Sequence, residues 1–160
     1  MNRERTYGWE DPHALAEASR ELSGLDFLTR LGAGELPVAP VSATTGVLLD
    51  GVGDGWAVFT LEPAEWHYNP IGSVHGGILS TLADSALGCA VHTKLPAGIG
   101  FTSLDLTMKF TRAATVDSGV LSCKGSVLTI GRRTATAEAT ITGSDDRVIA
   151  HAVSTCILMR

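Results

Sequence analysis

Positive charge is scarce in this sequence, and long apolar runs are missing. Its 160 residues hold 12 Lys and Arg against 17 Asp and Glu, which gives a net charge of −5 at pH 7. Nucleic-acid-binding domains normally carry a basic patch, so we expect no nucleic-acid partner. No apolar run reaches the roughly 18 residues that a membrane helix needs, so we expect no membrane contact. The N-terminal segment lacks the apolar core of a signal peptide, which predicts a cytoplasmic protein.

Cysteine is also sparse. The three cysteines, Cys89, Cys123 and Cys156, are odd in number and widely spaced. They fit neither a disulfide framework nor a zinc knuckle, and we expect them to be reduced core residues. The histidine spacing matches no standard zinc pattern, and no glycine motif for a nucleotide phosphate is present. We therefore expect neither a metal nor a separate cofactor.

What the sequence does contain is clear periodicity. In residues 11–31, leucine and alanine recur at spacings of three and four, which predicts one amphipathic helix. Asp11 is its expected N-cap, and Pro12 is its expected first residue. The glycines and prolines of residues 32–40 are expected to end it, because proline cannot continue a helix. Residues 46–61 predict two strand pieces around a glycine-rich turn.

From Gly76 to about His92 the pattern is helical and nearly free of charge on every side. A helix of that kind is usually buried. The segment TSLDLTMKF, residues 102–110, then alternates apolar and polar residues, which predicts a strand with Leu104, Leu106, Met108 and Phe110 on its buried face. Three more strand-like segments follow, separated by short turns. A sheet wrapped around the helix would bury both, so the predicted fold class is α+β.

A single carboxylate, Asp84, interrupts the central helix opposite its apolar stripe. Its neighbours one turn away, Ser80 and Gly88, are small, and no Lys or Arg lies at helical spacing to pair with it. A buried unpaired carboxylate is costly and is often retained for chemistry. The residues alone leave two readings open, namely a catalytic acid or an acid bonded to a backbone amide or a neighbouring strand.

The start of the helix offers a second chemical group. Gly76 and Gly77 lie in the first turn, where backbone N–H groups lack intrahelical partners and can hold an oxyanion. Asp84 lies about 12 Å further along the axis at the standard rise, which is too far for one reacting carbon. Either the helix begins later than Gly76, or the acid and the amide come from two subunits.

The stretch HYNPIGSVHGGILSTLADSALGCA, residues 67–90, resembles the signature of hotdog-fold acyl-CoA thioesterases of the phenylacetate-degradation (PaaI-like) branch. The later segments TSLDLTMKFTRAA, GRRTATAEATI and RVIAHAVSTCILM resemble the strands of that family. The resemblance covers about residues 24–158. It implies a hotdog fold with an extra N-terminal helix, in which residues 1–40 form the lead-in and residues 41–160 the thioesterase part of one structural domain.

The resemblance also implies roles for single residues. Asp84 matches the acid that acts as nucleophile or general base on the thioester. The N–H of Gly76, with Gly77 beside it, matches the group that polarises the thioester carbonyl. Asn69 matches a side chain that positions water or the carbonyl, and His75 is expected to shape the loop. The family's site lies between two subunits, so a homo-oligomer is implied, either a dimer or a homotetramer built as a dimer of dimers.

Three further residues are candidates for substrate binding. Ser103 matches a serine or threonine that contributes to the site in some members, yet its strand parity, opposite to Leu104, predicts that it faces away from its own helix. Arg132 and Arg133 lie at a predicted strand-to-strand turn, where they could hold CoA phosphates through charge-assisted bonds. They could equally be ordinary surface arginines.

Three functions remain open from the sequence. The first is hydrolysis of acyl-CoA, with CoA as part of the substrate. The second is a hotdog hydratase or dehydratase acting on enoyl thioesters through a His–acid pair. The third is acyl-CoA binding without catalysis. Asp84 on the helix with the HGG tripeptide favours hydrolysis.

Overall fold

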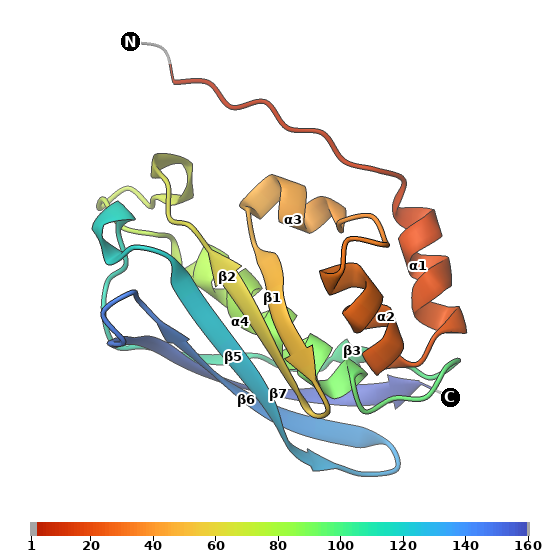
Figure 1. The fold of residues 1–160 in the computed structure, drawn as a ribbon. Coiled ribbons are helices and arrows are strands. Elements are labelled where there is room, and N and C mark those ends of the chain that lie inside the picture. The colour runs from red at the N-terminus through yellow and green to blue at the C-terminus, as the bar shows by residue number, and fades with distance from the viewer. Residues whose placement is uncertain (1–2, 160) are drawn as a thin grey trace.

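The computed structural model describes residues 3–159 and confirms one long helix held in a curved sheet (Figure 1). The central helix, α4, spans Gly76–His92, within the bounds expected from the sequence. In the described chain the sheet has seven antiparallel strands in the order β1-β2-β5-β6-β7-β3, and β4 also pairs with β7. The strands are β1 (Leu48–Gly53), β2 (Trp56–Leu61), β3 (Gly100–Ser103), β4 (Thr107–Phe110), β5 (Leu121–Ile130), β6 (Thr134–Thr142) and β7 (Val148–Met159).

The core lies between α4 and the concave face of the sheet. Leu82, Ala83, Ala86 and Leu87 of α4 are completely buried there. The sheet comes so close that a Cβ on Gly125 of β5 would lie 2.3 Å from the carbonyl oxygen of Ala86. Only glycine permits this approach.

The cysteines behave as expected from the sequence. Cys123 and Cys156 are buried in the core, Cys89 is half-buried on α4, and all three are free. Among residues 3–159, no helix combines the length and apolar character required to span a bilayer.

The N-terminal helix is split, contrary to the prediction of one helix. The chain forms α1 (Pro12–Glu21) and α2 (Gly24–Gly32), and Asp11 caps α1 as expected by accepting a bond from the His13 amide. The break has a packing cause, because a Cβ on Gly24 would lie 1.7 Å from the carbonyl oxygen of His92. Ser23 then caps the new helix through the amide of Asp26.

A short helix that was not predicted, α3 (Pro40–Thr45), lies where prolines argued against helical structure. Pro40 occupies its first turn, the one place where proline suits a helix. Figure 1 shows α1, α2 and α3 grouped on the side of the molecule away from β6 and β7.

The predicted continuous strand over residues 102–110 is also wrong, because a bulge divides it into β3 and β4. Ser103 pairs with Cys156 of β7, and Thr107 pairs with Val153. Between these two pairs the segment that joins β3 to β4 contains one residue more than β7 does. Asp105 holds the bulge, since its side chain accepts from the Thr155 amide at 3.0 Å. A bulge reverses which residues face the core.

The burial of this segment differs from the expected alternation at Leu104, before the bulge, and at Phe110, at the end of β4. Leu104 is 58% exposed and Phe110 is 53% exposed, although both were placed on the buried face. Leu106 and Met108 do pack against the core.

Candidate active site

Asp84 lies on the outer face of α4 and is exposed, so the expectation of a buried acid is wrong for the single chain. Ser103 of β3 donates a hydrogen bond from Oγ to Asp84 Oδ1 at 2.8 Å. The two side chains share a shallow hollow with Ser80, Thr81 and the bulge. The prediction that Ser103 faces away from its own helix is therefore wrong, because Ser103 precedes the bulge whereas the parity argument assumed one regular strand through residue 110.

The carboxylate of Asp84 has no cationic partner. Within residues 3–159 it forms no ion pair with Lys, Arg or His. Its charge reaches the neighbouring turn of α4, where burial and, second, the charge of Asp84 raise the pKa of Cys89 to about 12. The Cys89 thiol is thus a neutral side chain, and Asp84 is the reactive group that this face of the helix offers.

The first turn of α4 holds the second set of groups. His75 is the N-cap, and its Nδ1 accepts a hydrogen bond from the Gly77 amide at 2.8 Å. The Gly77 N–H is therefore already used, whereas within the described chain the Gly76 N–H donates to no protein acceptor. Gly76 borders a hollow of about 390 Å³ that Asn69, Phe110 and others line. Of the two glycines, Gly76 has the amide that is free for a carbonyl oxygen.

Asn69 organises the loop before this turn. Its Oδ1 accepts from the amides of Ile71 at 3.0 Å and Ser73 at 3.2 Å, and its Nδ2 donates to Ser73 Oγ at 3.0 Å. A carboxamide nitrogen carries two hydrogens, so one N–H of Asn69 remains to donate into the hollow beside Gly76.

A single protomer does not bring Asp84 to Gly76 and Asn69. Helix α4 begins at Gly76, so the idea of a later helix start is excluded and the axial separation of about 12 Å stands. The sheet gives the same result, because Phe110, which contacts Gly76, pairs with Ala150 of β7, whereas Ser103 pairs with Cys156. The acid and the free amide open into separate hollows.

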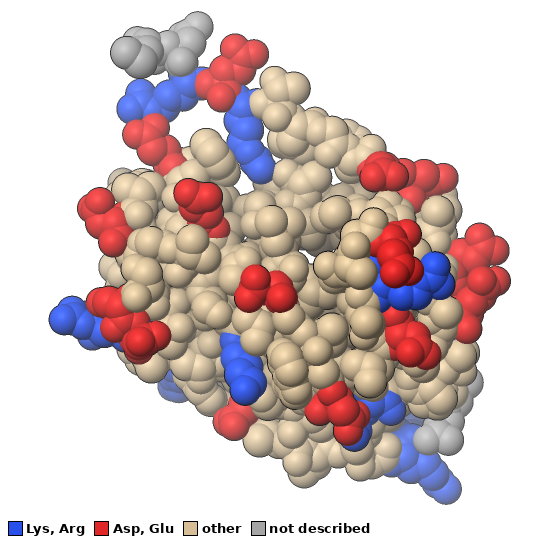
Figure 2. Space-filling view, viewed as in Figure 1, with Lys and Arg blue, Asp and Glu red and all other residues tan. Residues whose placement is uncertain are grey.

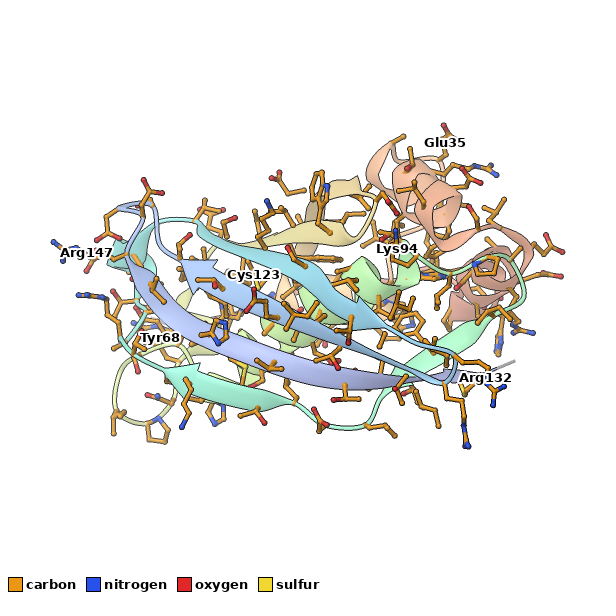
Figure 3. The ribbon with its side chains drawn as sticks, turned by 90° about the horizontal axis from the view of Figure 1, so that it is seen from below. Glu35, Tyr68, Lys94, Cys123, Arg132 and Arg147 are labelled. Atoms are coloured by element: carbon orange, nitrogen blue, oxygen red, sulfur yellow. The ribbon has the colours of Figure 1, made fainter. Side chains whose placement is uncertain are left out.

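Arg132 and Arg133 lie in the turn between β5 and β6 and are exposed. The amide of Leu158 donates to the carbonyl of Arg133 at 2.8 Å, two residues beyond the partner of Ser103 on β7. The arginines are thus at the Ser103 end of β7, and Figure 3 shows Arg132 at the opposite end of the sheet from Tyr68. On the face seen in Figure 2, the charged side chains are scattered.

Two other histidines, His67 and His92, have structural roles. His67 is buried, its Nδ1 accepts from the Ala64 amide, and its Nε2 lies 2.7 Å from the Thr45 carbonyl oxygen. Burial lowers the pKa of His67, and it also lowers the pKa of His92, which packs between Phe27 and Phe101. Among residues 3–159, no three His, Cys, Asp or Glu side chains come together as metal ligands.

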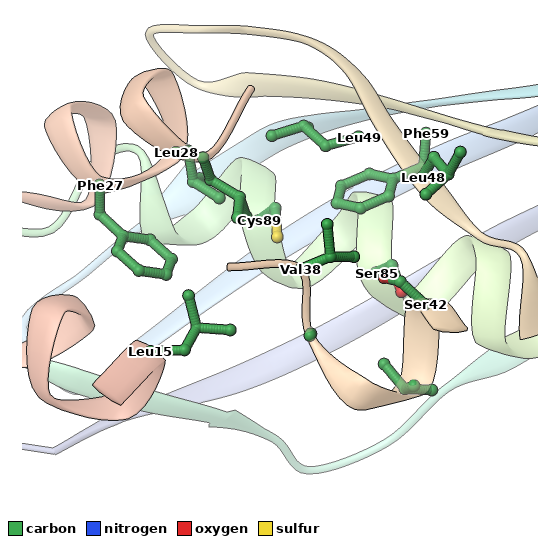
Figure 4. A pocket seen from close by; sticks show the side chains of 13 residues that line it. Leu15, Phe27, Leu28, Val38, Ser42, Leu48, Leu49, Phe59, Ser85 and Cys89 are labelled. Carbon is green, nitrogen blue, oxygen red and sulfur yellow. The ribbon is translucent and has the colours of Figure 1, made fainter. Parts of the chain in front are cut away.

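One feature of this region was missed from the sequence. An apolar cavity of about 370 Å³ lies between the N-terminal helices, β1, β2 and α4 (Figure 4). Ser85 and Cys89 of α4 line it, next to Asp84. The apolar residues around Pro37 and Pro40 could have indicated the cavity. Because α3 was not predicted, these residues had no expected packing partner.

Comparison with known proteins decides the family. The family model of the thioesterase superfamily matches residues 71–150, which include Gly76, Asp84 and Ser103. The chain belongs to the thioesterase superfamily. The enzyme is accordingly a thioester hydrolase with the hotdog fold that the resemblance implied. A search of curated proteins gives no match.

Solved structures support the PaaI-like branch. A phenylacetic acid degradation-related protein of Ralstonia eutropha is 26% identical with a TM-score of 0.73, and the match covers 81% of this chain and 98% of that one. A conserved protein of Pseudomonas aeruginosa is 28% identical with a TM-score of 0.71, over 76% and 95% of the two chains. The PaaI protein of E. coli shares the fold at 21% identity and a TM-score of 0.74, over 88% and 97%.

Proposed function

We propose that this enzyme hydrolyses acyl-CoA thioesters to the free acid and CoA, at a site built by two subunits. The observation that carries the proposal is the Asp84 carboxylate, held by Ser103 at 2.8 Å in an open hollow without a cation. A structural neighbour from Streptococcus mutans, 22% identical over 71% of this chain and 88% of its own with a TM-score of 0.64, was solved bound to acetyl-CoA. Membership of the thioesterase superfamily supports the same chemistry.

Each residue has a role in this scheme. Asp84 attacks the thioester carbon or takes a proton from the water that attacks it, and Ser103 orients the carboxylate. Gly76 of the partner subunit donates its free N–H to the carbonyl oxygen, where negative charge develops, and the helix dipole adds to the stabilisation. The spare N–H of Asn69 orients the carbonyl or the water. The C–S bond breaks, and the sulfur leaves as the thiolate of CoA. Where Asp84 is the nucleophile, water then hydrolyses the acyl–Asp84 anhydride, which releases the free acid and restores the carboxylate.

The edge of the sheet offers a surface for the second subunit. β3 and β4 lie beyond β7 as the last strands, and within the described chain no further strand covers them. Leu104, Phe110 and Val116 are exposed near this edge, and Ile71, in the loop beside Asn69, is 88% exposed. Edges and apolar residues of this kind are usually covered in stable proteins. We therefore place the subunit contact here, in a dimer or a dimer of dimers.

The hydratase alternative needs His75 as a base, and the structure disfavours that role. Because Nδ1 of His75 accepts the Gly77 amide, the proton of the neutral ring is on Nε2. The only remaining ring nitrogen is thus a donor, and protonating Nδ1 would break the N-cap. His75 acts instead as the residue that shapes the turn and leaves the Gly76 amide free.

A panel of CoA esters tests the reaction. Saturated and enoyl-CoA esters are incubated with the protein while free thiol and enoyl absorbance are followed. Thiol release from saturated esters is the expected result. Loss of enoyl absorbance without thiol release would establish the hydratase, and binding without either change would leave a non-catalytic protein.

A complementation experiment tests the shared site. Asp84→Asn removes the acid and Gly76→Pro removes the amide, so each homo-oligomer should be nearly inactive. In a mixed oligomer, one site combines the intact Asp84 of one subunit with the intact Gly76 of the other, and a second site carries both changes. Mixing the variants after mild dissociation should therefore restore activity. No recovery, with subunit exchange shown by mass spectrometry, would mean that each protomer carries a complete site.

A further inference from the structure

The apolar cavity in Figure 4 has a wall that the hotdog helix and sheet do not supply. Leu15 of α1, Phe27 and Leu28 of α2, and Ser42 of α3 face it from the N-terminal part of the chain. Its volume of about 370 Å³ lies within the range of natural ligand pockets, roughly 300–1,000 Å³. Within the described chain no charged side chain lines it.

The few polar groups in the wall are already satisfied or neutral. Ser85 Oγ donates to the carbonyl of Thr81 at 2.8 Å, so its hydroxyl hydrogen is not available to a ligand. Cys89 carries a neutral thiol, because burial and the charge of Asp84 raise its pKa to about 12. Ser42 adds one neutral hydroxyl to the wall, so a charged or strongly polar ligand would lose its hydration in this cavity and gain no charged partner.

The cavity is open to solvent along an apolar rim. Val38, Val41 and Leu48 line it and are 51%, 48% and 51% exposed. An exposed apolar rim around an apolar cavity is typical of a ligand entrance.

The cavity also adjoins the acid. Asp84 and Ser85 are consecutive residues of α4, so their side chains point about 100° apart around the same turn. Thr81 lies in the hollow of Asp84 and accepts the hydroxyl of Ser85, so these two residues separate the hollow from the cavity. The hollow of Asp84 and the apolar cavity therefore flank the same turn of α4.

We propose that this cavity receives the acyl tail of the substrate and selects medium-length, uncharged, apolar acyl groups. The inference rests on the proposed thioesterase function and adds to it the substrate class. A cavity of 150 Å³ holds benzene, so 370 Å³ holds an acyl tail on the order of ten carbons. Short acyl groups leave the cavity unfilled, and dicarboxylic acyl groups bring a charge that it does not accommodate.

The test is a chain-length series with one variant that fills the cavity. In the wild type, kcat/KM should rise by up to about fourfold per added methylene and level off near C10 to C12. Ser42→Leu adds bulk inside the cavity and should lower kcat/KM for dodecanoyl-CoA by about tenfold or more, with butanoyl-CoA changed by less than about twofold. Thr44→Leu is the matched control, because Thr44 is an exposed residue of α3 that does not line the cavity.

Two results with Ser42→Leu overturn the inference. One is an equal effect of Ser42→Leu on butanoyl-CoA and dodecanoyl-CoA, and the other is no effect on either while the protein stays folded. Glutaryl-CoA turnover that matches octanoyl-CoA would also contradict it.

A binding experiment separates this inference from the proposed function. Calorimetry with S-dodecyl-CoA and S-butyl-CoA, thioethers that cannot be hydrolysed, reports on the cavity even if no CoA ester releases thiol. Tighter binding of the dodecyl thioether that Ser42→Leu abolishes and Thr44→Leu preserves supports the cavity as the acyl site. Equal affinity of the two thioethers for the wild type refutes it, whether or not the esters are hydrolysed.

Discussion

Replacing Gly76 by proline removes one backbone N–H from the candidate site with little other disturbance. Gly76 is the first residue of α4, where proline is favoured because its fixed φ suits the helix and its missing N–H has no intrahelical partner. His75, the residue before it, has φ −62° and ψ 136°, the extended conformation that a following proline requires. Within residues 3–159 the Gly76 amide donates to no protein acceptor, so no internal bond is lost.

The size of the effect follows from the role of the amide. Loss of one oxyanion donor typically lowers kcat by about 10²–10³-fold. Gly76→Ala is the matched control, because it adds a Cβ but keeps the N–H. That Cβ would lie 3.2 Å from Cζ of Phe110, a side chain that can shift by a few tenths of an ångström. The ratio of kcat between the alanine and proline variants therefore separates the loss of the amide from the contact between the added Cβ and Phe110.

The assay is thiol release from the best CoA ester, with thermal melts of both variants. We expect Gly76→Ala to keep most of the activity and Gly76→Pro to lose about two to three powers of ten in kcat. If the folded proline variant stays within about threefold of the alanine variant, the Gly76 amide does not hold the carbonyl and the assignment of this turn is wrong.

Three other predictions address the acid, the arginines and the buried histidines. Asp84→Asn should lower kcat by about 10²–10⁴-fold. Ser103→Ala should lower kcat by about tenfold in the wild type but hardly at all in the Asp84→Asn background, because Ser103 acts through Asp84. If the two losses in kcat are instead additive, Ser103 has a role separate from Asp84. Changing Arg132 and Arg133 together to alanine should raise KM for CoA esters more than it lowers kcat, since contacts to phosphates stabilise the ground and transition states alike. Added salt should likewise raise the KM of the wild type. An unchanged KM in the double variant would mean that the two arginines do not contact the substrate. Burial lowers the pKa of His92 below its ordinary 6.5, so the unfolded chain takes up the proton first as pH falls and the free energy of unfolding should decrease below about pH 6.5. Urea titrations between about pH 7.5 and 5.5 should show this slope, and His92→Gln should reduce it; an identical slope in the variant would assign the pH dependence to other groups.

The local pattern of the sequence was sufficient for the central helix and for five of the seven strands. The bounds of α4 follow from one apolar segment, charged only at Asp84, that starts at a double glycine and ends before LPAGIG, residues 95–100. The strands β5, β6 and β7 follow from strand-like segments separated by short turns. Residue type and spacing singled out Asp84 and Gly76, and the resemblance of residues 67–90 to a known family added Asn69. Their roles in the site stay predictions. These signals are local, so no tertiary contact was needed to find them.

Only the tertiary structure determined the features that depend on contacts between distant segments of the chain. Gly24 splits the N-terminal helix because it lies against His92, and no pattern within residues 11–31 records that contact. The bulge at Asp105 turns Ser103 toward Asp84, and it is held by Ser154 and Thr155, about fifty residues later in the chain. A single inserted residue reverses the facing of a strand, so the parity argument failed for Ser103, where the facing mattered most. The apolar cavity likewise exists only after α3 packs beside α4, because its wall joins residues from Leu15 to Cys89.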